Sequence, residues 1–344
     1  MKLGESIPLP PAHRLQAPER PGDLPTDSEA SARAVDSVDL ARFQAGRTFT
    51  PDNARALAAL ATMAYADPED QRAHLAQQPA VRAFHFLDSK NNAGLGLPDP
   101  DTGTQVSVVE TDQAMLVAAS GTTRPGLTRG EPGDRDDWKD AFHDLAGLPT
   151  PNYAGTARVP WGFKKAADGI WGQLRPLLEI ARATHKQVHL AGHSLGAAVA
   201  LMLAERMTLE LGTLPRSVVR TGGPDCGWAD QEKHLENLGV AQRTFNFVNN
   251  CDPIPFLLPR GVTVGTRIYF DRHGEASLEP GPHKLDRALG AADLALRRQG
   301  PLQKHLPEAY NELLGDPDND EVLRKLARRL ATGRTSHPPS LGES

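Results

Sequence analysis

Cysteine is scarce in this sequence: Cys226 and Cys251 are the only two among 344 residues. Two cysteines cannot form the disulfide framework on which many small secreted domains depend, so burial of an apolar core must stabilise the fold. Each of the two follows a predicted strand, which would allow them to lie close together. Two buried thiols are nevertheless the expectation, because the sequence shows no secretory signal.

An excess of basic charge is also missing. Lys and Arg total 38 against 43 Asp and Glu, which gives a net charge of −5 and a sequence pI of about 6.2. This balance provides no electrostatic footprint for a polyanion, so nucleic acid is not expected as a partner.

Long apolar runs are absent as well. Residues 1–11 contain three prolines and Glu5, where a secretory signal needs about 7 to 15 apolar residues. The most apolar helical stretch, residues 195–204, has about half of the roughly 20 residues that a spanning helix requires. We therefore predict a soluble protein that is cytoplasmic as synthesised, with export by a non-classical route as the alternative.

What is present suffices for a large core. Hydrophobic residues make up 39% of the chain and glycine occurs 31 times, an ordinary globular content. The length allows about two domains, or one large α/β domain with tails. Residues 1–45 are rich in proline and show no apolar period, which predicts a disordered or extended N-terminal arm. We predict a single domain over 46–332 and a flexible tail over 333–344.

Helical and strand patterns alternate through the middle of the chain. Such alternation indicates right-handed crossovers and a mostly parallel sheet with helices on both faces. The predicted helices cover 51–65, 161–183, 194–211, 228–238, 283–298, 303–314 and 319–332. The predicted strands cover 81–87, 105–110, 114–119, 188–191, 217–221 and 244–248.

A nucleophile elbow is predicted at residues 192–196, whose sequence is Gly-His-Ser-Leu-Gly. The segment follows a predicted strand and opens a helix rich in alanine. In this context the serine of a G-x-S-x-G motif occupies a strained strand-to-helix turn. The turn also places the backbone N–H of Leu195 at a helix N-terminus, where it can stabilise an oxyanion. Ser194 is therefore the candidate nucleophile.

A serine nucleophile needs a histidine base that is oriented by a carboxylate, and in enzymes with this elbow the order is Ser, Asp, His. Asp252 comes just after the predicted strand 244–248, at the sheet edge where such sites lie. An ordinary turn aspartate before proline is the alternative. Of the four later histidines, His273 is expected in a hairpin turn and His337 in the tail. His283 and His305 remain, and the residues alone do not separate them, because each opens a helical segment.

Several further motifs occur in order along the chain. They are LVAASGT at 116–122, Asp137-Trp138 with Asp144-Leu145, RVPWGF at 158–163, AGHSLG at 191–196, TGGP at 221–224, FVNNCDPIPFLLP at 247–259 and HLPEAY at 305–310. Together they resemble the class 3 lipases, whose type members are fungal triacylglycerol lipases. The resemblance spans about residues 50–315.

The resemblance implies an α/β-hydrolase fold, with a mostly parallel central sheet flanked by helices. It also favours His305 as the base, and it assigns the oxyanion hole to Thr122 together with Leu195. The sequence departs from the family pattern at Ser120 in place of arginine, at Pro160 in place of histidine and at Asp225-Cys226 after the TGGP turn. These departures leave the substrate preference open.

In this family a lid follows the oxyanion strand, here at about residues 123–149. The segment is long and polar, with few apolar side chains that could dock on an oil surface. Phospholipids or soluble esters are therefore favoured over large triacylglycerol droplets. A surface Ω-loop without a gating role is the alternative.

We predict a serine hydrolase that cleaves carboxylic ester bonds of lipids through Ser194, His305 and Asp252. An acylglycerol lipase or a phospholipase would fit. The alternatives are an exported bacterial toxin of phospholipase A1 type, a short-chain carboxylesterase and a non-catalytic lipid binder. The expected partner is a lipid or ester substrate with transient lipid-surface contact, and an inhibitory protein partner is expected only for a toxin. Neither a metal nor an organic cofactor is required.

Overall fold

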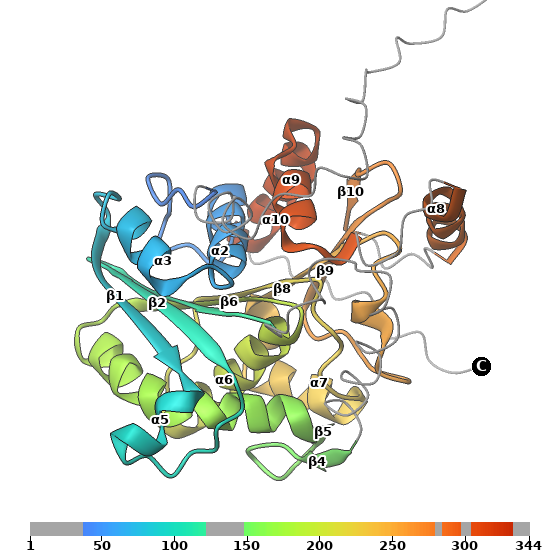
Figure 1. The fold of residues 1–344 in the computed structure, drawn as a ribbon. Coiled ribbons are helices and arrows are strands. Elements are labelled where there is room, and N and C mark those ends of the chain that lie inside the picture. The colour runs from blue at the N-terminus through green and yellow to red at the C-terminus, as the bar shows by residue number, and fades with distance from the viewer. Residues whose placement is uncertain (1–36, 122–147, 279–283, 297–303, 333–344) are drawn as a thin grey trace, which may run out of the picture.

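The computed structural model describes residues 37–121, 148–278, 284–296 and 304–332 (Figure 1). The helices are α2 (Pro51–Met63), α3 (Pro68–Leu75), α5 (Trp161–Ala183), α6 (Leu195–Leu211), α7 (Ala229–Asn237), α8 (Lys284–Leu296), α9 (Pro307–Gly315) and α10 (Asp320–Ala331). The strands are β1 (Val81–Asp88), β2 (Gln105–Thr111), β3 (Ala114–Ala119), β4 (Pro149–Pro151), β5 (Arg158–Pro160), β6 (Gln187–His193), β7 (Ser217–Thr221), β8 (Thr244–Asn249), β9 (Thr266–Phe270) and β10 (Ala276–Ser277).

Eight of these strands form one central sheet in the order β1-β2-β3-β6-β7-β8-β9-β10. Neighbouring strands from β3 to β9 pair in parallel. The strands β1 and β2 add an antiparallel edge, and β10 adds another at the far side. A separate ribbon pairs β4 with β5. The carboxyl ends of the parallel strands therefore meet at one edge of the sheet.

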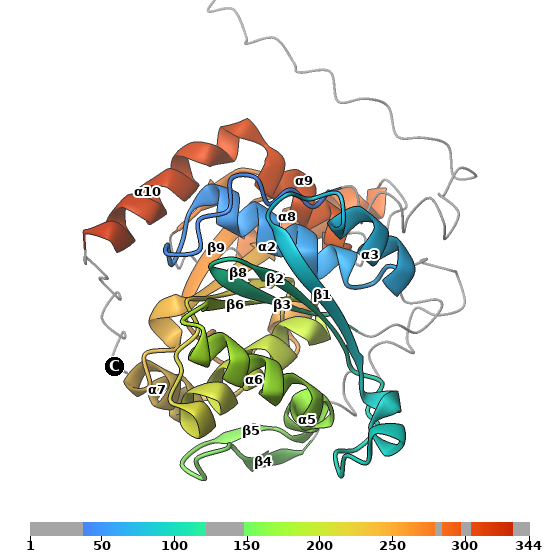
Figure 2. The same ribbon diagram turned by 90° about the vertical axis from the view of Figure 1, so that its left-hand side faces the viewer.

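Helices cover both faces of the sheet (Figure 2). The helices α5, α6 and α7 pack on one face, and α2, α9 and α10 pack on the other. Successive residues of a strand point to opposite faces, so Met115 and Val117 of β3 join the first core while Leu116 and Ala118 join the second. Burial on both faces explains the nearly continuous apolar run of this strand. The predicted fold class, an α/β-hydrolase with a mostly parallel sheet, is confirmed.

The packed chain begins earlier than predicted, so the arm expected over 1–45 extends too far. Val38 and Leu40 are buried in the core. The side chain of Gln78 accepts a hydrogen bond from Leu40 N at 3.2 Å and donates one to Val38 O at 2.8 Å. Two apolar residues in a polar stretch give no period, which is why the sequence pattern did not reveal this contact. Residues 1–36 and the predicted tail over 333–344 lie outside the described residues.

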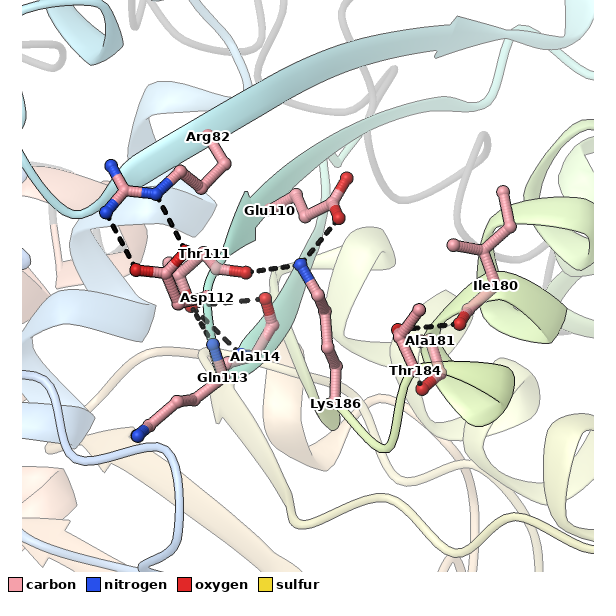
Figure 3. A network of polar contacts seen from close by, with 10 residues as sticks. All are labelled: Arg82, Glu110, Thr111, Asp112, Gln113, Ala114, Ile180, Ala181, Thr184 and Lys186. Carbon is pink, nitrogen blue, oxygen red and sulfur yellow. Dashed lines mark hydrogen bonds and ion pairs between the residues drawn. The ribbon is translucent and has the colours of Figure 1, made fainter.

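Polar contacts tie the β2–β3 turn to the start of β6 (Figure 3). Lys186 Nζ lies 2.6 Å from both Glu110 Oε1 and the carbonyl oxygen of Thr111. Arg82 of β1 holds Asp112 of the turn through a bidentate ion pair at 2.7 and 2.8 Å. These contacts lie at the amino end of β6, opposite the carboxyl edge. In the described ranges, every helix is too short or too polar to cross a bilayer.

Candidate active site

Ser194 occupies a strained turn between β6 and α6. Its backbone angles, φ 56° and ψ −128°, fall in a region that residues with a Cβ rarely adopt. A Cβ at Gly192 would collide with the carbonyl of Gly196, and a Cβ at Gly196 would collide with the carbonyl of Ala119. The two glycines of the elbow are therefore required by close backbone approach.

Three predicted residues meet at the carboxyl edge of the sheet. His305 Nε2 lies 2.8 Å from Ser194 Oγ, and His305 Nδ1 lies 2.9 Å from Asp252 Oδ2. Since a carboxylate only accepts hydrogen bonds, Nδ1 carries the proton and Nε2 is free to accept from the serine hydroxyl. The arrangement has the geometry of a nucleophile, a base and a carboxylate that orients the base.

Asp252 is fully buried and accepts three hydrogen bonds. Besides His305, Tyr310 Oη donates to Oδ2 at 2.5 Å, and the backbone N–H of Ile254 donates to Oδ1 at 2.9 Å. Tyr310 Oη in turn accepts from the backbone N–H of Asn249 at 3.1 Å. A buried carboxylate is stable only when it is paired in this way.

The backbone of the histidine segment is held by two side chains from strand ends. Asn249, the last residue of β8, donates from Nδ2 to Lys304 O at 3.0 Å. His193, the last residue of β6, has Nε2 2.6 Å from His305 O and Nδ1 2.8 Å from Tyr65 Oη. Because a carbonyl only accepts, Nε2 of His193 donates, and Nδ1 accepts from the tyrosine hydroxyl.

Burial keeps these supporting groups uncharged. It lowers the pKa of His193 well below the ordinary value, and the nearby His305 lowers that pKa further. It raises the pKa of Tyr310, and the negative charge of Asp252 adds to this rise. It also raises the pKa of Tyr65, although a backbone hydrogen bond with Gly121 acts in the other direction. Both tyrosines therefore stay protonated and continue to donate.

The other predicted site residues divide into two groups. Leu195 opens α6, and its backbone N–H belongs to the first helical turn, where no intrahelical acceptor exists. Thr122, His283 and the lid residues 123–147 lie outside the described residues. The geometry brings His305 to Ser194, while the role of Thr122 stays a prediction.

Sequence reasoning missed four residues of the site. Tyr65 and His193 contact each other across 128 positions, and no local pattern signals such a pair. Asn249 lies within the FVNNCDPIPFLLP motif, but its backbone-holding contact gives no signal. Gly222, with φ 57°, makes room for the site, because a Cβ there would lie 3.0 Å from both Asp252 Oδ2 and His305 Nδ1. The glycine at this position of the TGGP motif was the sequence signal that could have identified it.

Both cysteines are buried and free. Burial raises the pKa of the Cys226 thiol to about 11, so it stays protonated at neutral pH. Among the residues that the structure describes, no group of three or more His, Cys, Asp or Glu side chains could hold a metal ion.

The strand order and the elbow define an α/β-hydrolase. Residues 127–261 match the family model described as Lipase (class 3), which confirms the resemblance to this family over that segment. A comparison with curated proteins finds no significant match.

Three lipase structures illustrate the likeness among solved structures. The lipase of Rhizopus microsporus var. chinensis is 17% identical, with 63% of this chain and 72% of that chain covered and a TM-score of 0.47. The Lip2 lipase of Yarrowia lipolytica is 18% identical, with coverages of 58% and 70% and a TM-score of 0.44. The Rhizomucor miehei lipase propeptide complex is 20% identical, with coverages of 49% and 53% and a TM-score of 0.41. The chain thus spans about half the length of the last.

Proposed function

We propose that this protein is a serine hydrolase that cleaves carboxylic ester bonds of lipids through an acyl-enzyme. The observation that carries the proposal is the hydrogen-bonded chain from Ser194 Oγ through the His305 ring to Asp252. The match of residues 127–261 to the class 3 lipase model supports a lipid ester as substrate.

The reaction follows from the proton positions. Ser194 Oγ attacks the ester carbonyl carbon while His305 Nε2 takes the hydroxyl proton. The C–O bond to the alcohol then breaks, and the same proton passes from His305 to the leaving alcohol oxygen. Water then attacks the acyl carbon while His305 Nε2 takes one of its protons. The bond from the acyl carbon to Ser194 Oγ breaks, His305 returns the proton to that oxygen, and the carboxylic acid is released. Asp252 keeps the imidazole in the correct tautomer and stabilises the imidazolium that forms in each half-reaction.

The negative charge that develops on the carbonyl oxygen needs donors that are already in place. The N–H of Leu195, at the N-terminus of α6, is one donor. We assign the second to the backbone N–H of Thr122, which follows Gly121 just beyond the end of β3 in the sequence. Gly121 lies next to Ser194, because a Cβ on it would be 3.2 Å from Ser194 Cβ.

Replacing the nucleophile tests the proposal. Since members of such a triad act as a unit, Ser194→Ala is expected to lower kcat by roughly 10⁶-fold. Ser277→Ala on β10 is the matched control and should keep full activity. The assay is hydrolysis of phospholipids, acylglycerols and p-nitrophenyl esters of increasing chain length, with Ser194→Ala as the blank.

The same panel distinguishes an acylglycerol lipase from a phospholipase and from a short-chain esterase. Covalent labelling by an organophosphonate, followed by mass spectrometry, should modify Ser194 in the wild-type chain only. A wild-type chain that neither turns over an ester nor reacts with the phosphonate would instead be a lipid binder.

A further inference from the structure

A hollow lies at the opposite edge of the sheet from Ser194. It has a volume of about 460 Å³. Two of its lining residues, Arg216 and Arg243, come directly before β7 and before β8, at the amino ends of parallel strands. Ser194 follows the carboxyl end of β6, so the hollow is separate from the site described above. The loop before α2 contributes Arg47, and α10 contributes Leu330.

Three arginines line this hollow, and none of them is paired with an acidic side chain of the described residues. Within the described residues, neither Arg47 nor Arg216 nor Arg243 forms an ion pair, although many other arginines of this acidic chain do. Burial lowers the pKa of Arg243, and the positive charge of Arg216 lowers it further. The guanidinium groups of Arg216 and Arg243 therefore repel each other, and no acidic side chain among the described residues pairs with either of them.

Arg216 also has a donor that no described group satisfies. One terminal nitrogen of its guanidinium donates to the carbonyl of Gly46, which fixes the side chain in place. Its Nε is buried, and the described chain offers that atom no hydrogen-bond partner. An oxyanion that enters the hollow can accept from the guanidinium groups of Arg216 and Arg243 that line it, and charge-assisted bonds of this kind are stronger than neutral ones.

The remaining wall of the hollow is apolar. Phe49 is only 4% exposed, whereas Leu214 is 39% exposed and so presents apolar surface to a ligand. Leu330 and Ala327 of α10 line the same space. A ligand that fits would combine an anionic head with an alkyl chain.

We propose that this hollow binds an anionic amphiphile, with its oxyanion head between Arg216 and Arg243 and its alkyl chain along Phe49, Leu214 and Leu330. The head is a carboxylate, as in a fatty acid, or a phosphate ester, as in a lipid phosphate. A fatty acid is also the product class of the proposed ester hydrolysis, but the site rests on its own residues and does not need that activity.

Titration calorimetry on the full chain carrying Ser194→Ala tests the proposal, because it is independent of turnover. The probes are dodecanoate and dodecyl phosphate below their micelle concentrations, with inorganic phosphate as the bare head and dodecyl maltoside as the uncharged amphiphile. We expect both anionic amphiphiles to bind, the tighter one identifying the head group. Their affinity should fall as the NaCl concentration rises, and the maltoside should not bind.

Variants locate the binding. Arg216→Gln and Arg243→Gln should each weaken binding by about tenfold or more. Arg324→Gln, on the exposed side of α10, is the matched control and should bind as before. Leu214→Ser should weaken the binding of both anionic amphiphiles and leave the affinity for inorganic phosphate unchanged. An amphiphile bound near Ser194 would not respond to the arginine variants.

Three results would overturn the site: unchanged affinity in both arginine variants, equal binding of the maltoside, or no binding at all. If the glutamine variants fail to fold, the probe and salt comparisons on the Ser194→Ala chain still decide between an anion site and none.

Discussion

The imidazole of His305 is positioned through its backbone as well as through its ring. Asn249 and His193 hold the carbonyl oxygens of Lys304 and His305, two consecutive residues. Both residues are the last of their strands, β6 and β8 of the central sheet. The base therefore depends on the sheet for its distance from Ser194, in addition to its bond with Asp252.

Removing the donor at His193 should slow the reaction without weakening substrate binding. In His193→Leu the carbonyl of His305 loses its partner, so we expect kcat to fall by about tenfold, equivalent to ~1.4 kcal/mol, with KM little changed. His193→Gln keeps an N–H donor and should retain more of the activity. Tyr65→Phe, which removes only the hydroxyl that fixes the His193 tautomer, should have a smaller effect. A rise in KM at constant kcat would instead place His193 in the substrate pocket.

Tyr310 supports the carboxylate of the site. Tyr310→Phe removes one of the three hydrogen bonds to buried Asp252 and leaves the ring in place. A hydrogen bond to a charged group contributes about 1.5 to 3 kcal/mol, so we expect lower stability by that order and a kcat reduced several-fold. Urea unfolding and steady-state kinetics measure the two effects. Asp318→Asn serves as the control, because Asp318 is exposed and makes no contact with Tyr310 or Asp252.

At the scale of elements, a buried carboxyl group joins α6 to α7, and through Gln231 it is linked to the turn between β4 and β5. Glu205 of α6 is fully buried, with Oε2 2.7 Å from Gln231 Nε2 and Oε1 3.2 Å from His234 Nε2. Gln231 Oε1 accepts from Asn152 Nδ2 of that turn at 2.9 Å. Burial raises the pKa of Glu205 to about 7, while the hydrogen bond from Gln231 acts against this rise. The hydrogen-bonded chain from this turn therefore ends on a carboxyl group whose pKa is raised toward neutral pH.

This raised pKa predicts that Glu205→Gln increases the free energy of unfolding by an amount that depends on pH. From its ordinary pKa of 4.5 up to about 7, the unfolded chain has lost the proton that the folded chain keeps, so the free energy of unfolding falls as the pH rises. Above pH 7 Glu205 is ionised in both states, and its burial lowers the free energy of unfolding by up to about 3 kcal/mol for that difference in pKa. Glutamine cannot ionise and avoids this cost.

Urea unfolding of both proteins measures the difference in the free energy of unfolding. We expect Glu205→Gln to exceed the wild type at about pH 8 and to approach it at about pH 5. Glu179→Gln, an exposed position on α5, is the control, because no buried charge is relieved there. A constant difference between the two pH values would show that Glu205 does not titrate in this range.

For the whole molecule, the sequence predicted what is encoded locally. The alternation from α5 to β8 gave the parallel sheet, because each helix and strand has its own apolar period. β9 was not predicted, since it follows a connection without an α-helix, and α3 was not predicted because it buries only Gln71 and Leu75. Ser194 and Asp252 were found from strand ends, whereas His305 required the family resemblance.

The two ends of the described chain are joined on one face of the sheet. Arg55 of α2 donates from Nε to Leu314 O of α9 at 2.7 Å and forms an ion pair with Asp320 of α10. The helix α9 also carries Tyr310 and follows His305. Contacts of α2 with α9 and α10 therefore stabilise the segment that bears His305, the proposed base.

Arg55→Met keeps the apolar stem of the side chain and removes these polar contacts. We expect the free energy of unfolding to fall by about 1 to 3 kcal/mol, because a partly buried charged hydrogen bond is lost together with an ion pair. Arg324→Met is the matched control: Arg324 pairs with the same Asp320 at 3.0 Å but is 64% exposed, so its loss should cost less than about 0.5 kcal/mol. Thermal unfolding and thermal loss of ester hydrolysis should shift together in Arg55→Met. Equal destabilisation by the two variants would mean that the link between α2 and α9 contributes nothing beyond a surface ion pair.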